Sequence, residues 1–256
     1  MVLRSLVVLG FILVGFSGYS QDQQPTQEKI ELPKATPVAK KKTFRPDIPG
    51  SILVELGINL KNGITPPDFQ KGLWGSRTIN IYYQYPIRLF KSRISFNPGI
   101  GLSLERWKFT NNYTLAQQPL LNGYHELVPA KTYYPNATIN RSQLINNYLE
   151  IPLEFRYDTN PEDIARSINI TFGGRVGVLY DSFTKIDYSE SSEDKSIKDK
   201  QRHGINPIRY GLYGRIGIGG FALFSYVNMS PMFESNKGPL GTQMNSVTMG
   251  ISVNGF

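Results

Sequence analysis

Apolar and polar residues alternate with a period of two along most of residues 50–256, and this pattern constrains the chain more than any other feature. Successive side chains of a β-strand point to opposite faces, so each alternating segment predicts a strand with one apolar and one polar face. The predicted strands cover residues 52–60, 78–89, 94–105, 145–157, 168–181, 208–218, 221–233 and 246–254. The phase of the alternation is ambiguous in the seventh of these segments.

Two kinds of β fold fit such segments. A soluble sandwich or lipocalin-like barrel has its apolar face inside, whereas a membrane barrel turns that face towards lipid. The segments exceed the roughly 5 to 6 residues of an ordinary strand and match the roughly 9 to 11 residues of a tilted membrane strand. Short connections alternate with long ones, which is typical of a membrane barrel with periplasmic turns and outer loops. The short connections are 91–93, 158–166 and 219–220, and the long ones are 61–76, 110–143, 186–206 and 234–241.

The polar faces carry four Glu and five Arg, which are too many charges for the core of a soluble protein. They are Glu55, Arg88, Glu105, Glu150, Glu154, Arg156, Arg175, Arg209 and Arg215. The interior of an eight-stranded barrel is just wide enough for side chains to fill it. We therefore expect a structural salt-bridge network in the lumen, with a narrow ion path or a ligand pocket as the alternative.

The expected fold is all-β: an eight-stranded antiparallel up-and-down transmembrane β-barrel over residues 50–256. An even number of strands leaves both termini on the periplasmic side, and closure leaves no unpaired strand edge in lipid. Phe256 ends the chain, and a terminal aromatic residue resembles the assembly signal of outer-membrane barrels. Val253, Ile251 and Met249 lie in the opposite register to it, which departs from that signal.

The first 20 residues are typical of a cleaved signal peptide. Arg4 precedes an apolar run at residues 6–16, and Gly18 and Ser20 occupy the small-residue positions before the expected cleavage. The run is short for a membrane-spanning helix, which needs roughly 20 residues; an uncleaved anchor helix is the alternative. Residues 21–49 are rich in Lys, Pro and Gln, and they predict a flexible, disordered periplasmic tail.

The composition excludes several kinds of site. The chain has no Cys, which excludes disulfides, thiolate metal sites, a cysteine nucleophile and a lipid-modified N-terminal cysteine. Its formal charge of +8 comes from dispersed Lys and Arg, so we expect no nucleic-acid partner. Attraction to anionic lipid headgroups or to periplasmic polyanions explains the charge better.

The sequence contains no candidate catalytic, cofactor-binding or metal-binding residues. Its two histidines, His125 and His203, fall in predicted outer loops without the pattern of a nucleophile and its base. The acidic stretch at 187–194 lacks the spacing of a calcium-binding loop. Tyr and Trp near strand ends are expected to form interfacial belts, with partner contacts as the alternative. They include Trp74, Trp107, Tyr180 and Tyr188.

The longest connection, residues 110–143, is the best candidate for a functional surface. Loops of this length are usually functional or disordered, and aromatic side chains can provide contact area for a partner. The aromatic residues in question are Tyr113, Tyr124, Tyr133 and Tyr134. We expect a partner-contact loop here, and a simple lid over the barrel mouth is the alternative.

Three motifs lie at or near predicted strands: Arg45-Pro46-Asp47-Ile48-Pro49-Gly50, Ser95-Phe96-Asn97-Pro98-Gly99-Ile100-Gly101 and Tyr148-Leu149-Glu150-Ile151-Pro152-Leu153. Together they resemble the small porin-family outer-membrane β-barrels of Bacteroidota, including the PorT type. The resemblance covers residues 50–256 and implies, for the PorT subgroup, a role in type IX protein secretion and gliding. It transfers no catalytic or binding residue.

The leading hypothesis is a non-enzymatic scaffold or accessory component of the bacterial outer membrane. Its expected partners are outer-membrane lipids and periplasmic or outer-membrane proteins. A small pore or ligand-binding barrel is the second hypothesis, and a lipid-modifying or proteolytic outer-membrane enzyme is the third.

Overall fold

The computed structural model describes residues 50–256 except residues 91, 118–122, 241 and 256. The predicted signal peptide at 1–20, the predicted tail at 21–49 and the terminal Phe256 lie outside the described residues. Asp47–Phe256 form one compact unit.

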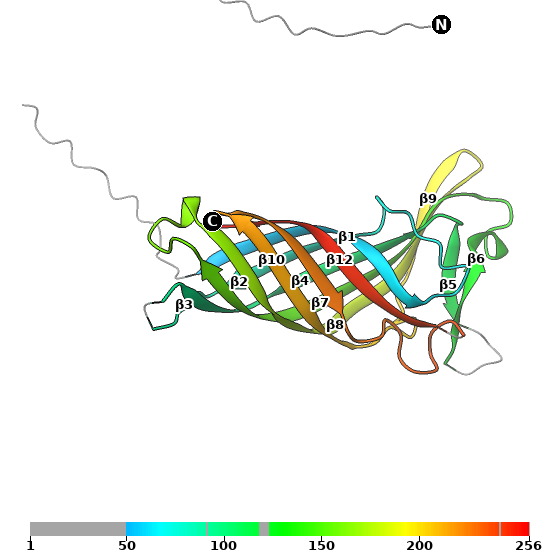
Figure 1. The fold of residues 1–256 in the computed structure, drawn as a ribbon. Helices are drawn as coiled ribbons and strands as arrows, with labels where there is room; N and C mark the ends of the chain where they lie inside the picture. The colour runs from blue at the N-terminus through cyan, green and yellow to red at the C-terminus, as the bar shows by residue number, and fades with distance from the viewer. Residues whose placement is uncertain (1–49, 91, 118–122, 241, 256) are drawn as a thin grey trace, which may run out of the picture. The chain divides into compact units, whose positions relative to one another are not determined.

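Eight antiparallel strands close into a barrel, as the alternation predicts (Figure 1). The strands are β1 (Ser51–Ile64), β2 (Arg77–Gln84), β4 (Ile94–Phe109), β7 (Thr138–Asp158), β8 (Ile168–Glu190), β10 (Ile208–Ile218), β11 (Phe221–Asn228) and β12 (Gln243–Asn254). Each strand pairs with the next along the chain, and β1 pairs with β12 to complete the ring. Beyond Pro86, the short β3 (Ile87–Arg88) continues the path of β2 along β4.

Three short connections lie at one end of the barrel, which we call the turn end: those between β3 and β4, β7 and β8, and β10 and β11. The last is the two-residue turn Gly219–Gly220, in which Gly219 has φ 60°. Glycine suits this turn because positive φ costs it little. The second connection contains the 3₁₀ turn η2 (Ile164–Arg166). The four longer connections lie at the opposite end, which we call the loop end.

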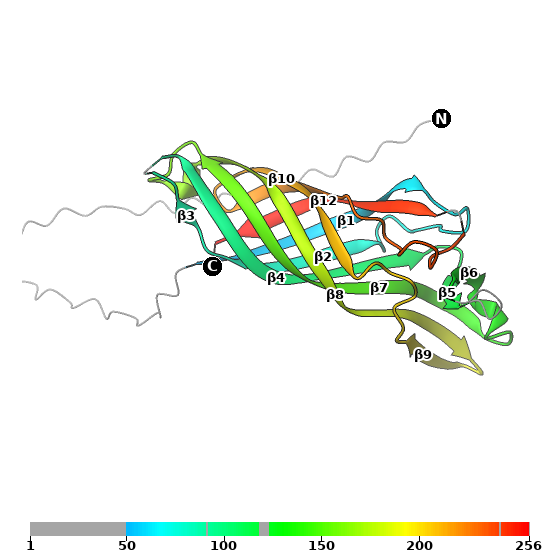
Figure 2. The ribbon, with the colours of Figure 1, turned by 90° about the horizontal axis from the view of Figure 1, so that it is seen from below.

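The loop end is more ordered than the sequence predicts. Two of its predicted loops, 110–143 and 186–206, contain β5 (Tyr113–Gln117), β6 (His125–Pro129), the 3₁₀ turn η1 (Ala130–Thr132) and β9 (Glu193–Asp199). β5 and β6 form a separate two-stranded sheet, whereas β9 pairs with the extension of β8 (Figure 2). Strand β7 likewise begins at Thr138. The prediction of plain loops here was wrong, because the apolar side chains of these extensions pack on one another instead of facing lipid.

The exterior of the barrel is apolar. Outward residues such as Leu56, Phe172 and Ile216 are 50%, 64% and 56% exposed. On β4 the apolar outward positions run from Ile94 to Leu104. This run spans about 33 Å along a strand, or about 25 Å along the axis at a tilt of about 40°. An apolar band of about that height is what a membrane barrel presents to lipid. Within the described residues, no helix is long and apolar enough to cross a bilayer.

Aromatic side chains confirm the belt prediction only in part. Trp74 and Tyr180 are 82% and 54% exposed, as a belt requires. The prediction is wrong for Trp107 and Tyr188, which are buried. Trp107 faces the lumen, and Tyr188 packs on Tyr134 beyond the barrel. Exposed aromatics also ring the turn end: Tyr83, Tyr85, Phe90, Phe155, Tyr157 and Phe221.

Candidate functional site

The barrel interior holds an ionic network at mid-height. Arg175 on β8 donates from its two terminal nitrogens to the two carboxylate oxygens of Glu55 on β1, both at 2.8 Å. It also donates to Glu154 on β7 at 3.4 Å, and Glu154 in turn accepts from Arg215 on β10 at 3.4 Å. All four side chains are at most 1% exposed.

A second cluster of the network lies around Arg209 on β10. Its guanidinium donates to Glu150 at 2.5 Å, to Glu105 at 2.6 Å and to the Ser103 hydroxyl at 2.5 Å. Tyr82 joins the two clusters, because its hydroxyl donates to Glu150 and accepts from Arg175 at 3.2 Å. Charge-assisted hydrogen bonds of this kind are stronger than neutral ones and compensate the desolvation of buried charges.

Aromatic rings pack against the arginines of the network. The guanidinium carbon of Arg175 lies 3.7 Å from the ring centroid of Tyr213 and 4.7 Å from that of Tyr82. The guanidinium carbon of Arg209 lies 3.9 Å from the ring centroid of Tyr148. These contacts add cation–π attraction to the ion pairs of the network.

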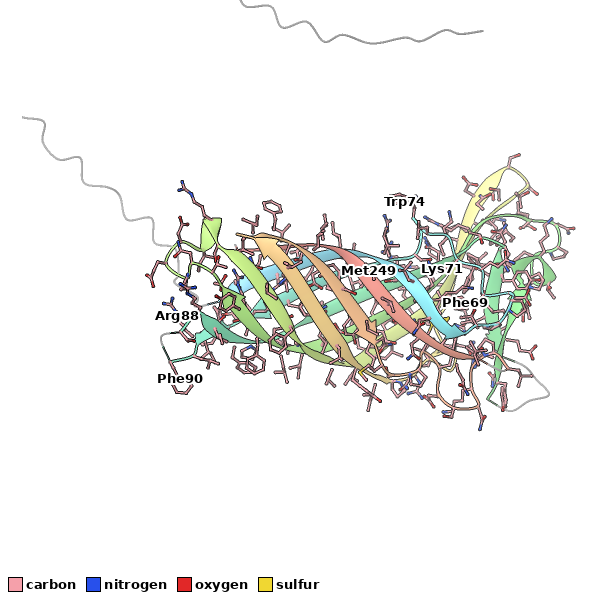
Figure 3. All side chains as sticks on the ribbon, viewed as in Figure 1. Phe69, Lys71, Trp74, Arg88, Phe90 and Met249 are labelled. Atoms are coloured by element: carbon pink, nitrogen blue, oxygen red, sulfur yellow. The ribbon has the colours of Figure 1, made fainter. Side chains whose placement is uncertain are left out.

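Seven of the nine predicted lumen residues thus belong to one network: Glu55, Glu105, Glu150, Glu154, Arg175, Arg209 and Arg215. The structure does not bring the other two into it. Arg156 pairs with Asp158 at 2.8 Å, an inward carboxylate that the sequence analysis assigns to a turn. Arg88 lies at the turn end, where it reaches Glu162 at 3.4 Å with its side chain 44% exposed (Figure 3).

A cavity of about 350 Å³ opens at the turn end, below the network. Arg88, Arg156 and Asp158 line it together with Asn97. This cavity is the space in the barrel that the alternative prediction, a ligand pocket in the lumen, would use.

An apolar plug fills the barrel at the loop end, and the sequence analysis missed it. We use this name for Phe69, Trp107, Phe109, Leu115, Leu144, Tyr148, Ile205, Met232, Phe233 and Met244, all buried. Phe69 comes from the connection between β1 and β2 and packs edge-on against Trp107 and Phe109, with centroids 5.8 and 5.2 Å apart. The sequence does carry a signal for this plug. After the charged Glu105, the inward positions of β4 are the aromatic Trp107 and Phe109.

The plug is covered by a cap made of the loop-end connections. His125 and His203 lie edge to face within it, with ring centroids 5.5 Å apart. Nδ1 of His125 lies 3.2 Å from the Lys237 carbonyl oxygen, and Nε2 of His203 lies 3.3 Å from that of Asp199. Burial lowers the pKa of His203 below its ordinary value, and the neighbouring His125 lowers it further. Both imidazoles are therefore packing groups of the cap.

The four tyrosines of the predicted contact surface occupy different places in this cap. Tyr113 lies on β5, and Tyr124 lines a cavity of about 650 Å³ beside Phe233 and Pro239. Tyr134 stacks on Tyr188 with centroids 4.7 Å apart. Tyr133 is the most open of the four, with 54% of its surface exposed. Across residues 50–256, apart from the gaps given above, no group of three or more His, Asp or Glu is arranged to hold a metal ion.

A closed antiparallel barrel with an apolar exterior and a charged interior defines an integral membrane β-barrel. Residues 43–233 match the model of the outer membrane protein beta-barrel domain, and the chain belongs to this family. The protein is accordingly one of the bacterial outer membrane.

Two solved structures are among those compared with this chain. One is Ail, the attachment invasion locus protein of Yersinia pestis, solved in complex with the heparin analogue sucrose octasulfate. It is 11% identical over 80% of this chain and 99% of its own, with a TM-score of 0.32. A mutant porin of Rh. blastica is 10% identical over 80% of this chain and 98% of its own, with a TM-score of 0.16. Scores this low carry no argument about this chain. No curated protein matches it.

Proposed function

We propose that this protein is a non-enzymatic, non-conducting scaffold of the outer membrane that presents its loop end to partner proteins. The observation that carries the proposal is the filled lumen. The ionic network occupies mid-height, and the apolar plug occupies the loop end. A path for ions would have to displace buried pairs such as Arg175–Glu55 and then cross an apolar layer, so the outer surfaces are left to carry the function.

Conductance in planar bilayers tests the closed lumen. The full chain is expected to give no steady openings, whereas a general porin in the same bilayer gives them. Steady openings of this protein would favour the small-pore alternative and overturn the proposal.

The proposed orientation places the turn end and the tail at 21–49 in the periplasm and the loop end outside the cell. Short turns on the periplasmic side are the rule in bacterial barrels, and this supports the assignment. Because the chain has no Cys, single cysteines can report each side without background. A membrane-impermeant maleimide on intact cells should label Glu193→Cys at the loop end and spare Glu162→Cys at the turn end. The opposite pattern would invert the orientation.

The proposed partner surface is the cap around Tyr133, with the periplasmic tail as a second contact. Half-exposed tyrosines supply rigid contact area at low entropic cost, which favours this site. Affinity purification from outer membranes would compare the full chain, a chain without residues 21–49 and Tyr133→Ser. If both altered chains still co-purify every protein that the full chain co-purifies, both proposed contacts are refuted.

A role in type IX protein secretion or gliding remains a proposal that rests on the three PorT-like motifs. Deleting the gene should then reduce the amount of secreted protein and the gliding rate, and the wild-type gene should restore both. An unchanged secretome would refute the role in secretion, but it would not contradict the proposal that the protein is a scaffold.

The packing of His125 and His203 inside the cap supports the non-enzymatic assignment, since a general base has to reach its substrate. The double variant His125→Gln, His203→Gln is expected to keep every outer-membrane activity of the wild type. Selective loss of a lipid-modifying or proteolytic activity in a folded double variant would overturn it.

A further inference from the structure

A groove of about 280 Å³ lies on the outer wall of the barrel, near the loop end, across β4, β7, β8 and β9. Its floor includes the apolar side chains of Leu104, Ile145 and Phe183, and its rim includes four basic ones. The basic residues are Arg106, Arg141, Lys185 and Lys198. The strand registers explain the gathering, because Arg106 is paired with Ile145, Ile145 with Phe183, and Lys185 with Lys198.

Two of the four cations are held by one carboxylate. Asp187 accepts from Arg141 at 2.5 and 2.8 Å and lies 3.2 Å from Lys185. Within the described part of the chain, neither Arg106 nor Lys198 has a carboxylate partner. Two further acids lie on this side: Asp181 accepts from Asn147 at 3.3 Å, and Asp194 accepts from Ser189 at 2.5 Å.

The positive charge continues beyond the groove on the same side of the barrel. Arg77 on β2 is paired with Arg106, and Lys108 is paired with Gln143 of the groove. Six cations therefore lie on the outer wall of β2, β4, β7, β8 and β9, against the three carboxylates of Asp181, Asp187 and Asp194. Outward positions on β10, β11 and β12, across the barrel, include Tyr210, Val227, Asn245 and Val247, which carry no charge.

The groove begins where the apolar belt ends. Leu102 and Leu149 are paired and are 41% and 45% exposed, as lipid-facing residues are. Arg106 follows Leu102 by four residues, which is about 13 Å along the strand and about 10 Å along the barrel axis. This height corresponds to the headgroup layer of the adjoining leaflet, where basic pockets bind anionic lipid headgroups.

We propose that this groove binds a phosphorylated glycolipid of the outer leaflet, with phosphate against Arg106 and Lys198 and acyl chain against Leu104 and Phe183. Charge complementarity and the apolar floor together select an anionic lipid over a free anion. The inference rests on the orientation proposed above, because the loop end has to face the outer leaflet. The binding measurement itself does not depend on orientation, so the two can fail separately.

The test titrates the full chain in detergent with bisphosphorylated lipid A and measures occupancy by native mass spectrometry. Dephosphorylated lipid A and inorganic phosphate are separate arms. The groove variant is Arg106→Gln with Lys198→Gln. Its control is Arg88→Gln with Arg166→Gln, which removes two cations from the turn end. Heat-modifiable gel mobility shows that each variant is folded.

The groove variant is expected to bind bisphosphorylated lipid A about thirtyfold more weakly, since each surface cation contributes about 1 kcal/mol. The control variant should bind bisphosphorylated lipid A as the wild type does. Both of these proteins should bind dephosphorylated lipid A poorly. Equal loss in the two variants, or equal binding of the dephosphorylated lipid, would overturn the proposal. Inorganic phosphate that binds alone with the same affinity would assign the site to free phosphate and overturn the lipid assignment.

Discussion

Arg175 and Glu55 lie 120 residues apart in the sequence and meet in the lumen through two parallel hydrogen bonds of 2.8 Å. They come from β8 and β1, which are not neighbours in the sheet, so the pair ties two separate walls of the barrel together. A planar guanidinium suits this task, since it matches both carboxylate oxygens at once and also packs its face on Tyr213.

Replacing Arg175 with Met should lower the free energy of unfolding by about 3 to 5 kcal/mol, because the buried carboxylate of Glu55 loses its salt-bridge partner. Urea unfolding in lipid vesicles, followed by tryptophan fluorescence, measures the change. Arg88→Met at the turn end is the control and should stay within about 0.5 kcal/mol of the wild type. Equal stabilities of the two variants would contradict the role given to the pair.

Phe69→Ala should loosen the apolar plug, whereas Trp74→Ala, in the same connection, should not. Phe69 is fully buried between Trp107 and Phe109, and Trp74 is 82% exposed (Figure 3). Emptying such a site costs about 3 to 5 kcal/mol. Limited proteolysis should cleave the β1–β2 connection faster in the first variant. Similar cleavage rates in the two variants would mean that Phe69 does not hold this connection.

Acidification should weaken the cap through His203. Burial lowers its pKa, with His125 adding to the shift, so below about pH 6.5 the folded cap binds fewer protons than the unfolded one. Stability is therefore greatest above that pH and falls as the pH drops towards the lowered pKa. Protection factors for amide hydrogen exchange at residues 200–206, which are corrected for the base-catalysed intrinsic rate, should be smaller at about pH 5.5 than at about pH 7.5. His203→Gln should remove most of this dependence; a variant with the full wild-type response would assign it to another group.

Gly101→Ala should impair assembly of the barrel, while Gly214→Ala should be tolerated. A Cβ at position 101 would lie 2.1 Å from the Ile81 carbonyl oxygen and 2.6 Å from the Tyr82 ring. At position 214 it would meet nothing within 4 Å. Overpacking costs about 1 to 3 kcal/mol, and the displaced Tyr82 would also disturb the link between the two clusters of the network. Folding yield in vesicles measures this, and equal yields would show that the strands adjust without cost.

The barrel was predictable because its strands repeat one simple rule, with apolar side chains facing out and polar ones facing in. The rule became ambiguous in β11, where Phe224 and Tyr226 face the lumen and Ser225 faces outward. The inward charges were also readable, but their partners were not. Which Glu meets Arg175 or Arg209 depends on the stagger of the strands around the ring, and no local pattern records it.

The loop end was harder to predict because the direction of burial changes there. Ile139 and Ile186 continue the apolar alternation of β7 and β8. Beyond the barrel, however, they belong to one buried cluster and do not face lipid. Tryptophan is common in interfacial belts, but position 107 has the register of an inward-facing residue. The register, and not the residue type, gave the correct location of Trp107. Arg88 shows the opposite error, since Pro86 interrupts the strand and leaves this side chain at the rim.

Strands β7 and β8, with 21 and 23 residues, are about two to three times as long as β10 and β11, with 11 and 8. The additional residues of β7 and β8 extend beyond the barrel on one side only, and β9 adds a further strand to this extension (Figure 2). The rim of the barrel is therefore asymmetric. A protein that approaches in the plane of the membrane meets a tall sheet on the β7–β8 side and a short one on the β10–β11 side.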